Sequence, residues 1–201
     1  MPDSAPSAFI HNFLPGKASS TVLVLHGAGG DENDLLPVAR GLAPGAAFLS
    51  PRGKALTGGM ARFFSDPTEL SARTAELAEW VGAAAAHYGL DTAKVYALGF
   101  SNGAAMAASV MLRHAGVLAG GLLLRPGTII EPRELPYLDG APVLVIAGSQ
   151  DDRMPRGTGE HLARMLGRAG AAVEMAMLDA EHELTPQDFS LGKSWFTKVL
   201  G

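Results

Sequence analysis

A serine flanked by glycines is the first feature of this sequence that could do chemistry. Ser101 lies in the segment GFSNG (99–103), which follows an apolar run and precedes an alanine-rich segment with helical periodicity. On a strand-to-helix turn, a G-x-S-x-G segment holds the serine in a strained conformation that exposes its hydroxyl. The plain alternative is a tight turn whose serine only caps the helix. The position of the motif between a predicted strand and a predicted helix favours a nucleophile.

A serine hydroxyl becomes a good nucleophile only beside a base, which in turn needs a carboxylate to orient it. Asp151 and His182 each lie shortly after a later apolar run. The chain order serine, aspartate, histidine is that of α/β-hydrolases, so we predict that these residues form a triad with Ser101. We expect the remaining histidines to have structural or solvated roles, and His26 to hold the adjacent glycine-rich turn. These histidines are His11, His26, His87, His114 and His161.

That glycine-rich turn, HGAGG (26–30), follows the predicted strand Thr21–Leu25. Small residues there let backbone amides converge on the oxyanion that forms when a hydroxyl attacks an acyl carbon. One amide would come from this turn and the other from Asn102. A phosphate-binding loop is disfavoured, because no GK[ST] follows and a nearby acidic cluster would repel phosphate. The acidic cluster consists of Asp31, Glu32 and Asp34. We expect its negative charge mainly to stabilise the N-terminus of the next helix, with Asp34 as the N-cap.

The elements that must position these residues alternate between short apolar runs and helical patterns. The predicted strands are Thr21–Leu25, 46–50, 94–100, 118–124, 142–147 and, more weakly, 172–177. The predicted helices are 34–43, 68–88, 102–114, 157–169 and Pro186–Leu200, whereas 51–67 and 125–141 have no clear element. Such alternation predicts a mostly parallel sheet of about six or seven strands with helices on both faces. Ligands then bind beyond the carboxyl ends of the strands, where the candidate residues lie.

Length and composition narrow the class of protein. The 201 residues fit one domain (1–201), with residues 1–20 as a loosely structured segment or an edge strand. The absence of cysteine excludes disulfides, thiolate metal sites and a cysteine nucleophile. A net charge of −4 without a basic stripe disfavours binding to nucleic acid. No apolar run is long enough for a membrane span, and the N-terminus lacks the features of a signal peptide, so we expect a cytoplasmic protein.

Together these segments resemble the phospholipase/carboxylesterase family of α/β-hydrolases, which includes small bacterial relatives of the acyl-protein thioesterases. The resemblance covers about residues 21–200 and rests on LHGAGGDENDLLPVA (25–39), PRG (51–53), RFF (62–64), YGLD (88–91), GFSNGAAMAAS (99–109), LLLRP (122–126), GSQDDRMP (148–155) and EHELTPQD (181–188). It implies an α/β-hydrolase domain without a large cap, which hydrolyses carboxylic esters and, as a second class, thioesters. It implies a small-molecule ester substrate and no metal or organic cofactor, and it leaves a homodimer open.

The resemblance also assigns roles to single residues. The family's nucleophile, acid, base and two oxyanion amides fall on Ser101, Asp151, His182, Ala28 and Asn102. Asp151 lies three residues after Gly148 and four before Pro155, as in the family's G-x-x-D-x-x-x-P. Its neighbour Asp152 stands where the family usually has proline, and Glu181 where it usually has glycine. Because adjacent side chains in an extended segment point to opposite sides, only one of the two aspartates can orient the base, and we predict Asp151.

Loops near the strand ends supply candidate walls for an acyl site, although methionine and phenylalanine at such positions are more often ordinary core residues. The candidates are Met60, Phe63, Phe64, Met106 and Met154.

Three alternative functions share the predicted fold. A dienelactone-hydrolase-like enzyme would usually have a cysteine nucleophile, which this chain lacks. A non-catalytic ligand-binding protein would typically have lost part of the triad, and a peptidase would need more surface to hold a peptide. An esterase is therefore the leading hypothesis.

Overall fold

Each predicted apolar run forms one strand of a seven-stranded sheet in the computed structural model, which describes residues 8–201. The strand order is β1-β3-β2-β6-β7-β8-β9; β1 runs antiparallel to β3, and the other neighbours are parallel. The strands are β1 (His11–Leu14), β2 (Thr21–Leu25), β3 (Ala47–Pro51), β6 (Val95–Phe100), β7 (Gly120–Leu124), β8 (Pro142–Gly148) and β9 (Ala172–Leu178). A separate hairpin pairs β4 (Ala55–Thr57) with β5 (Met60–Arg62). This is the mostly parallel α/β architecture that the sequence predicted.

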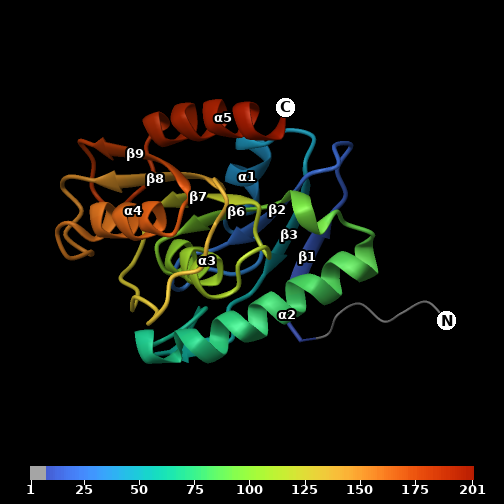
Figure 1. The fold of residues 1–201 in the computed structure, drawn as a ribbon, viewed down its shortest axis with the longest axis horizontal. Helices are drawn as coiled ribbons and strands as arrows, with labels where there is room; N and C mark the ends of the chain where they lie inside the picture. The colour runs from blue at the N-terminus through green and yellow to red at the C-terminus, as the bar shows by residue number, and fades with distance from the viewer. Residues whose placement is uncertain (1–7) are drawn as a thin grey trace.

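Helices cover both faces of the sheet (Figure 1). On one face α1 (Leu36–Leu42) packs against α5 (Pro186–Leu200). On the other face α3 (Asn102–Arg113) lies between α2 (Leu70–Tyr88) and α4 (Thr158–Arg168). Two short 3₁₀ helices, Pro67–Glu69 and Thr92–Lys94, precede α2 and β6.

Alternate residues of each strand enter two different cores, because successive side chains point to opposite faces of a sheet. Val22 and Val24 lie in the core under α1 and α5. Leu23 and Leu25 lie in the core under α2, α3 and α4. All four side chains are inaccessible to solvent. The central strands therefore read as continuous apolar runs, since both faces are covered.

Residues 51–67, which the sequence left without an element, contain the β4–β5 hairpin. Each of its strands has only three residues, too few to show a period. The turn uses Gly58 and Gly59, both with positive φ (58° and 80°), a conformation that glycine adopts without a steric penalty. The edge strand β1 lies within the first twenty residues, while residues 1–7 of that segment lie outside the described part.

The predicted N-cap of α1 is wrong. The first turn of α1 contains no acidic residue, and its N-cap position is Leu35, so Asp34 does not cap it. Asp34 instead accepts a hydrogen bond from the Asp31 amide (3.0 Å). The carboxylate of Glu32, nearly buried, accepts one from the Arg52 guanidinium (2.8 Å). This bond lowers the pKa of Glu32 and ties the loop after β2 to the loop after β3.

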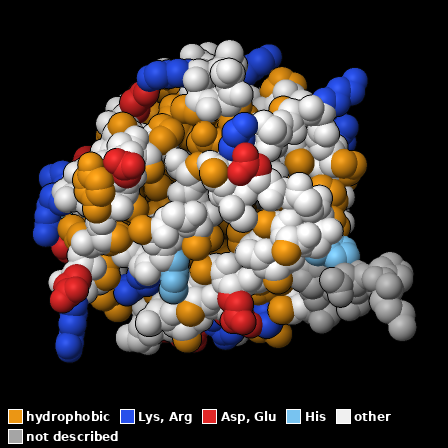
Figure 2. Space-filling view, turned by 45° about the vertical axis from the view of Figure 1, so that its right-hand side comes forward, with side chains coloured by type: hydrophobic (Ala, Val, Ile, Leu, Met, Phe, Trp, Pro, Cys, Tyr) orange, Lys and Arg blue, Asp and Glu red, His pale blue; other side chains and the backbone are white. Residues whose placement is uncertain are grey.

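The parallel topology brings the candidate residues to one edge of the sheet. Ala28, Ser101, Asp151 and His182 follow β2, β6, β8 and β9, whose carboxyl ends meet there. Within residues 8–201, no helix is long and apolar enough to cross a membrane. On the face shown in Figure 2, acidic and basic side chains are interspersed among hydrophobic and uncharged ones.

Candidate active site

Ser101 occupies a strained turn between β6 and α3. Its φ and ψ are 54° and −113°, a combination that residues with a Cβ rarely adopt. The Ser101 amide donates to the carbonyl of Leu124 on β7 (2.9 Å). A Cβ on Gly99 would lie 2.6 Å from the Ala104 Cα, and one on Gly103 would lie 2.1 Å from the Leu25 carbonyl oxygen. The two glycines therefore allow helix and strand to approach closely while the serine side chain is lifted above the sheet.

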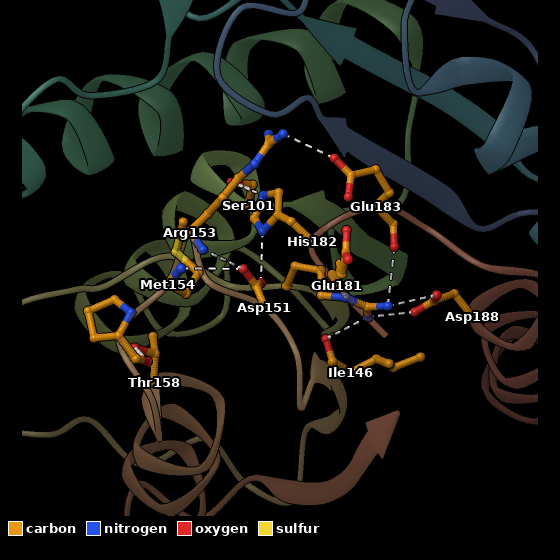
Figure 3. Close-up of polar contacts among 12 residues, drawn as sticks. Ser101, Ile146, Asp151, Arg153, Met154, Thr158, Glu181, His182, Glu183 and Asp188 are labelled. Atoms are coloured by element: carbon orange, nitrogen blue, oxygen red, sulfur yellow. Dashed lines mark hydrogen bonds and ion pairs between the residues drawn. The ribbon is translucent and has the colours of Figure 1, made fainter. Parts of the chain in front are cut away.

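His182 connects Ser101 to Asp151 (Figure 3). Its Nε2 lies 3.0 Å from the Ser101 Oγ, and its Nδ1 lies 2.8 Å from Asp151 Oδ2. The second carboxylate oxygen of Asp151 accepts hydrogen bonds from the amides of Arg153 (3.0 Å) and Met154 (3.3 Å). A carboxylate in this position accepts a hydrogen bond from Nδ1–H and so keeps the proton on Nδ1, which leaves Nε2 free to accept the serine proton. This arrangement can support nucleophilic attack on an acyl carbon.

The structure places Asp151, and not Asp152, against the histidine. The Asp151 and His182 side chains are 6% and 5% exposed, whereas Asp152 is exposed to solvent. The Phe100 ring packs beside the imidazole with its centre 5.1 Å away. The hydrogen-bonded chain therefore lies largely out of water, where electrostatic interactions are stronger than at the surface.

A buried arginine, not singled out as a site residue from the sequence, holds the loop that carries His182. The side chain of Arg125 is inaccessible to solvent and forms a two-pronged ion pair with Asp188, at 2.7 and 3.0 Å. It also donates to the backbone carbonyls of Glu181 (3.0 Å) and Glu183 (3.4 Å), on either side of His182. The sequence contains one indication of this role, since Arg125 directly follows the apolar run LLL (122–124). A charge at the end of a buried strand needs a carboxylate partner.

Removing one partner of this ion pair should destabilise the fold strongly. We expect Asp188→Asn to lower the free energy of unfolding by about 3–5 kcal/mol, because it leaves the buried Arg125 charge without its counter-ion. The lost cap on α5 adds to this, since the Asp188 carboxylate also accepts hydrogen bonds from the Thr185 amide and hydroxyl (both 2.8 Å). Urea denaturation followed by circular dichroism measures the change.

A double variant separates stability from loop positioning. In Arg125→Met with Asp188→Leu no charge is left buried, so much of the lost stability should return. The carbonyls beside His182 would still lack their donors, so we expect kcat to remain reduced even in the refolded variant. A double variant with parental kcat would show that the loop keeps its position without Arg125.

The glycine-rich turn after β2 is held by His26, as the sequence suggested. Its Nδ1 donates to the Gly27 carbonyl (2.7 Å), and its Nε2 accepts from the Gly53 amide (2.9 Å). Burial lowers the pKa of His26, because desolvation disfavours the charged form, and the neutral ring can accept this bond. The Gly29 amide donates to the Ala61 carbonyl (2.9 Å), which fastens the turn to the β4–β5 hairpin. Ala28, between these anchored residues, faces the hollow beside Ser101.

The side chain of Asn102 has a role that sequence reasoning missed. Its Oδ1 accepts from the Phe63 amide (2.8 Å), and its Nδ2 donates to the Phe64 carbonyl (3.0 Å). The residue after the nucleophile thus ties the nucleophile turn to the segment that follows β5. Asn102 also lines the hollow beside Ser101, together with Ala28.

A hollow of about 500 Å³ opens beside Ser101 and His182. Three of the five predicted wall residues line it: Met60, Phe64 and Met154. The other two predictions are wrong in placement. Phe63 is 2% exposed, and its ring packs against that of His26, with the ring centres 4.8 Å apart. Met106 is 1% exposed and belongs to the core around α3.

Comparisons with known proteins agree with this geometry. No family model matches the chain. It is 34% identical over 197 residues to MhqD of Bacillus subtilis (strain 168), which carries a provisional name as a hydrolase; the match covers 94% of this chain and 98% of MhqD. A carboxylesterase structure from Bacillus cereus is 36% identical with a TM-score of 0.89, covering 93% and 92% of the two chains. A carboxylesterase structure from Mesorhizobium loti is 29% identical with a TM-score of 0.87, covering 94% and 95%.

Proposed function

Because the chain belongs to the phospholipase/carboxylesterase family of α/β-hydrolases, we propose that it is a serine hydrolase that cleaves carboxylic esters through an acyl-enzyme. The observation that carries this proposal is the hydrogen-bonded chain from Ser101 through His182 to Asp151 at a strained strand-to-helix turn. Thioesters, which have the same acyl carbon and a better leaving group, are a second substrate class for the same site.

In the acylation half-reaction, the Ser101 Oγ attacks the ester carbon while His182 Nε2 removes its proton. Asp151 remains ionised and stabilises the imidazolium. The amides of Ala28 and Asn102 are proposed to receive the oxyanion, which supports catalysis because they are held before the charge forms. The imidazolium then gives its proton to the leaving alcohol.

In the deacylation half-reaction, a water molecule takes the place of the alcohol. His182 removes a proton from it, the hydroxide attacks the acyl-serine, and the proton returns to Ser101 as the acid leaves. The apolar side chains of Met60, Phe64 and Met154 are proposed to contact the acyl group. Burial of its methylene groups there would stabilise binding by up to about 0.8 kcal/mol each.

A fluorophosphonate probe tests the proposed function directly. Such a reagent phosphonylates an activated serine, so we expect mass spectrometry to find the label on Ser101. Ser65 is an internal control, because it lines the same hollow but its hydroxyl contacts Thr57 rather than a histidine. Labelled Ser65, or no label on the folded protein, would contradict an activated Ser101 and favour a non-catalytic ligand-binding protein.

A further inference from the structure

The hollow beside Ser101 has an unbalanced charge. Its lining includes two arginines, Arg62 and Arg153, and no aspartate or glutamate. The charge of Arg153 is compensated, because its guanidinium pairs with Glu183 at 3.0 Å in an exposed position. Arg62 has no ion pair with any residue in the range 8–201, and its Nε is buried without a hydrogen-bond acceptor.

Three carboxylates that lie within a few residues, along the chain, of residues lining the hollow are already engaged. Glu32 binds Arg52, Glu69 lies 3.6 Å from Arg73, and Asp151 is held by His182 and two amides. A buried guanidinium donor without an acceptor is costly, because desolvation removes its water and nothing replaces it. An anion entering the hollow would supply the counter-charge that Arg62 lacks among residues 8–201.

The backbone on both sides of Arg62 is fastened to the reacting centre. Ala61 accepts from the Gly29 amide (2.9 Å), in the turn that contains Ala28. Phe63 donates to the side chain of Asn102 (2.8 Å), the residue after Ser101. The chain at Gly53 also passes so close that a Cβ there would lie 2.3 Å from the Arg62 carbonyl. Arg62 is therefore anchored between the two segments that carry the proposed oxyanion amides.

We propose that Arg62 is a specificity-determining residue that binds a carboxylate carried by the substrate, in either the acyl or the alcohol part of the ester. This inference rests on the proposed function, since the substrate is the ester cleaved at Ser101. The planar guanidinium fork suits a carboxylate, which it can bind through two parallel hydrogen bonds. The preferred substrates are then half-esters of dicarboxylic acids or esters of hydroxy acids, rather than neutral esters of the same size.

Matched pairs of esters test the proposal and locate the carboxylate. In the acyl arm, mono-4-nitrophenyl adipate is compared with its terminal amide. In the alcohol arm, the butyrate ester of 4-hydroxybenzoic acid is compared with that of 4-hydroxybenzamide. In at least one arm we expect kcat/KM to favour the carboxylate about ten- to a hundredfold, the range of one hydrogen bond to a charged group. Raising NaCl from about 0.01 to about 0.5 M should reduce this ratio.

Variants assign the preference to one side chain. Arg62→Gln should bring the charged-to-neutral ratio close to one, and Arg62→Lys should retain part of it. The matched control Arg153→Gln removes an arginine from the same hollow and should keep most of the preference, because Glu183 already compensates that charge. A ratio near one in both arms of the parent, or a preference that survives in Arg62→Gln, would overturn the proposal.

A binding measurement keeps this test separate from the test of catalysis. In Ser101→Ala, isothermal titration calorimetry should show adipate monoamide binding at least about tenfold more tightly than adipamide, with the difference lost when Arg62→Gln is added. Equal affinities would overturn the Arg62 proposal. Hydrolysis of neutral and charged esters at equal rates would also overturn the Arg62 proposal, but it would leave the serine-hydrolase proposal intact. A Ser101 that the fluorophosphonate probe does not label would contradict the serine-hydrolase proposal, whereas the binding measurement would still test Arg62.

Discussion

Replacing Ser101 by alanine should lower kcat for ester hydrolysis at least about a thousandfold. Without the hydroxyl, no acyl-enzyme can form, and His182 has no serine proton to accept. The residual activity would come from substrate binding and from the oxyanion amides, which still act on attack by water. Steady-state kinetics with a 4-nitrophenyl ester, on protein whose fold is checked by circular dichroism, measures the loss.

The control for this variant is Ser65→Ala. Ser65 lines the same hollow as Ser101, but its hydroxyl is paired with that of Thr57 at 2.8 Å. We expect kcat for this variant to stay close to the parental value. Parental activity in Ser101→Ala would show that another group attacks the ester, and the proposed mechanism would be wrong.

Replacing Asp151 by asparagine should lower kcat by about 10⁴, the cost of the equivalent change in a serine protease. The asparagine amide can hydrogen-bond to the imidazole but favours the tautomer with its proton on Nε2, which can no longer accept the Ser101 proton. The buried carboxylate would also no longer stabilise the imidazolium that forms in the transition state. Stopped-flow and steady-state measurements of kcat at neutral pH test this expectation.

Asp152→Asn is the matched control, because it makes the same chemical change one residue further on. The Asp152 side chain is exposed, and Asp151 alone lies against His182. We expect the control to stay within roughly tenfold of the parent, since exposed charges are screened by water. A larger loss in Asp152→Asn than in Asp151→Asn would move the acid to Asp152. Mild losses in both would require another carboxylate to orient the base.

The sequence predicted the central strands because they are buried in a sheet that is covered on both faces, as β2, β3 and β7 are along their whole length. The edge strand β9 is partly exposed, and its pattern in the sequence is correspondingly weaker. Thr21–Leu25 and Pro186–Leu200 have the predicted bounds, and every other predicted strand or helix agrees within two residues at either end. Local patterns are sufficient here, since apolar runs, helical periodicity and turn glycines act over a few residues. The meeting of Ser101, Asp151 and His182 was also predictable, because parallel strands end at one edge of the sheet.

The side-chain partners that complete the site were not predictable from local patterns. Arg125 finds Asp188 63 residues away, and the side chain of Asn102 binds the backbone at Phe63, 39 residues away. The periodicity of apolar residues does not indicate which polar groups, distant in the sequence, will form hydrogen bonds with each other. The hairpin that carries Arg62 was missed for a related reason, since its three-residue strands are defined by their pairing and not by any period.

The sequence by itself thus determined the fold class, the order of the elements and the residues with catalytic potential, because these follow from local composition and the rules of parallel sheets. The tertiary structure decided which side chains face the hollow: Phe64 lines it while Phe63 packs on His26. It also decided that Glu32 pairs with Arg52, whereas Arg62 has no counter-ion among residues 8–201. Charge balance and side-chain direction depend on packing between segments distant in the chain, so they emerge only when the whole domain is assembled.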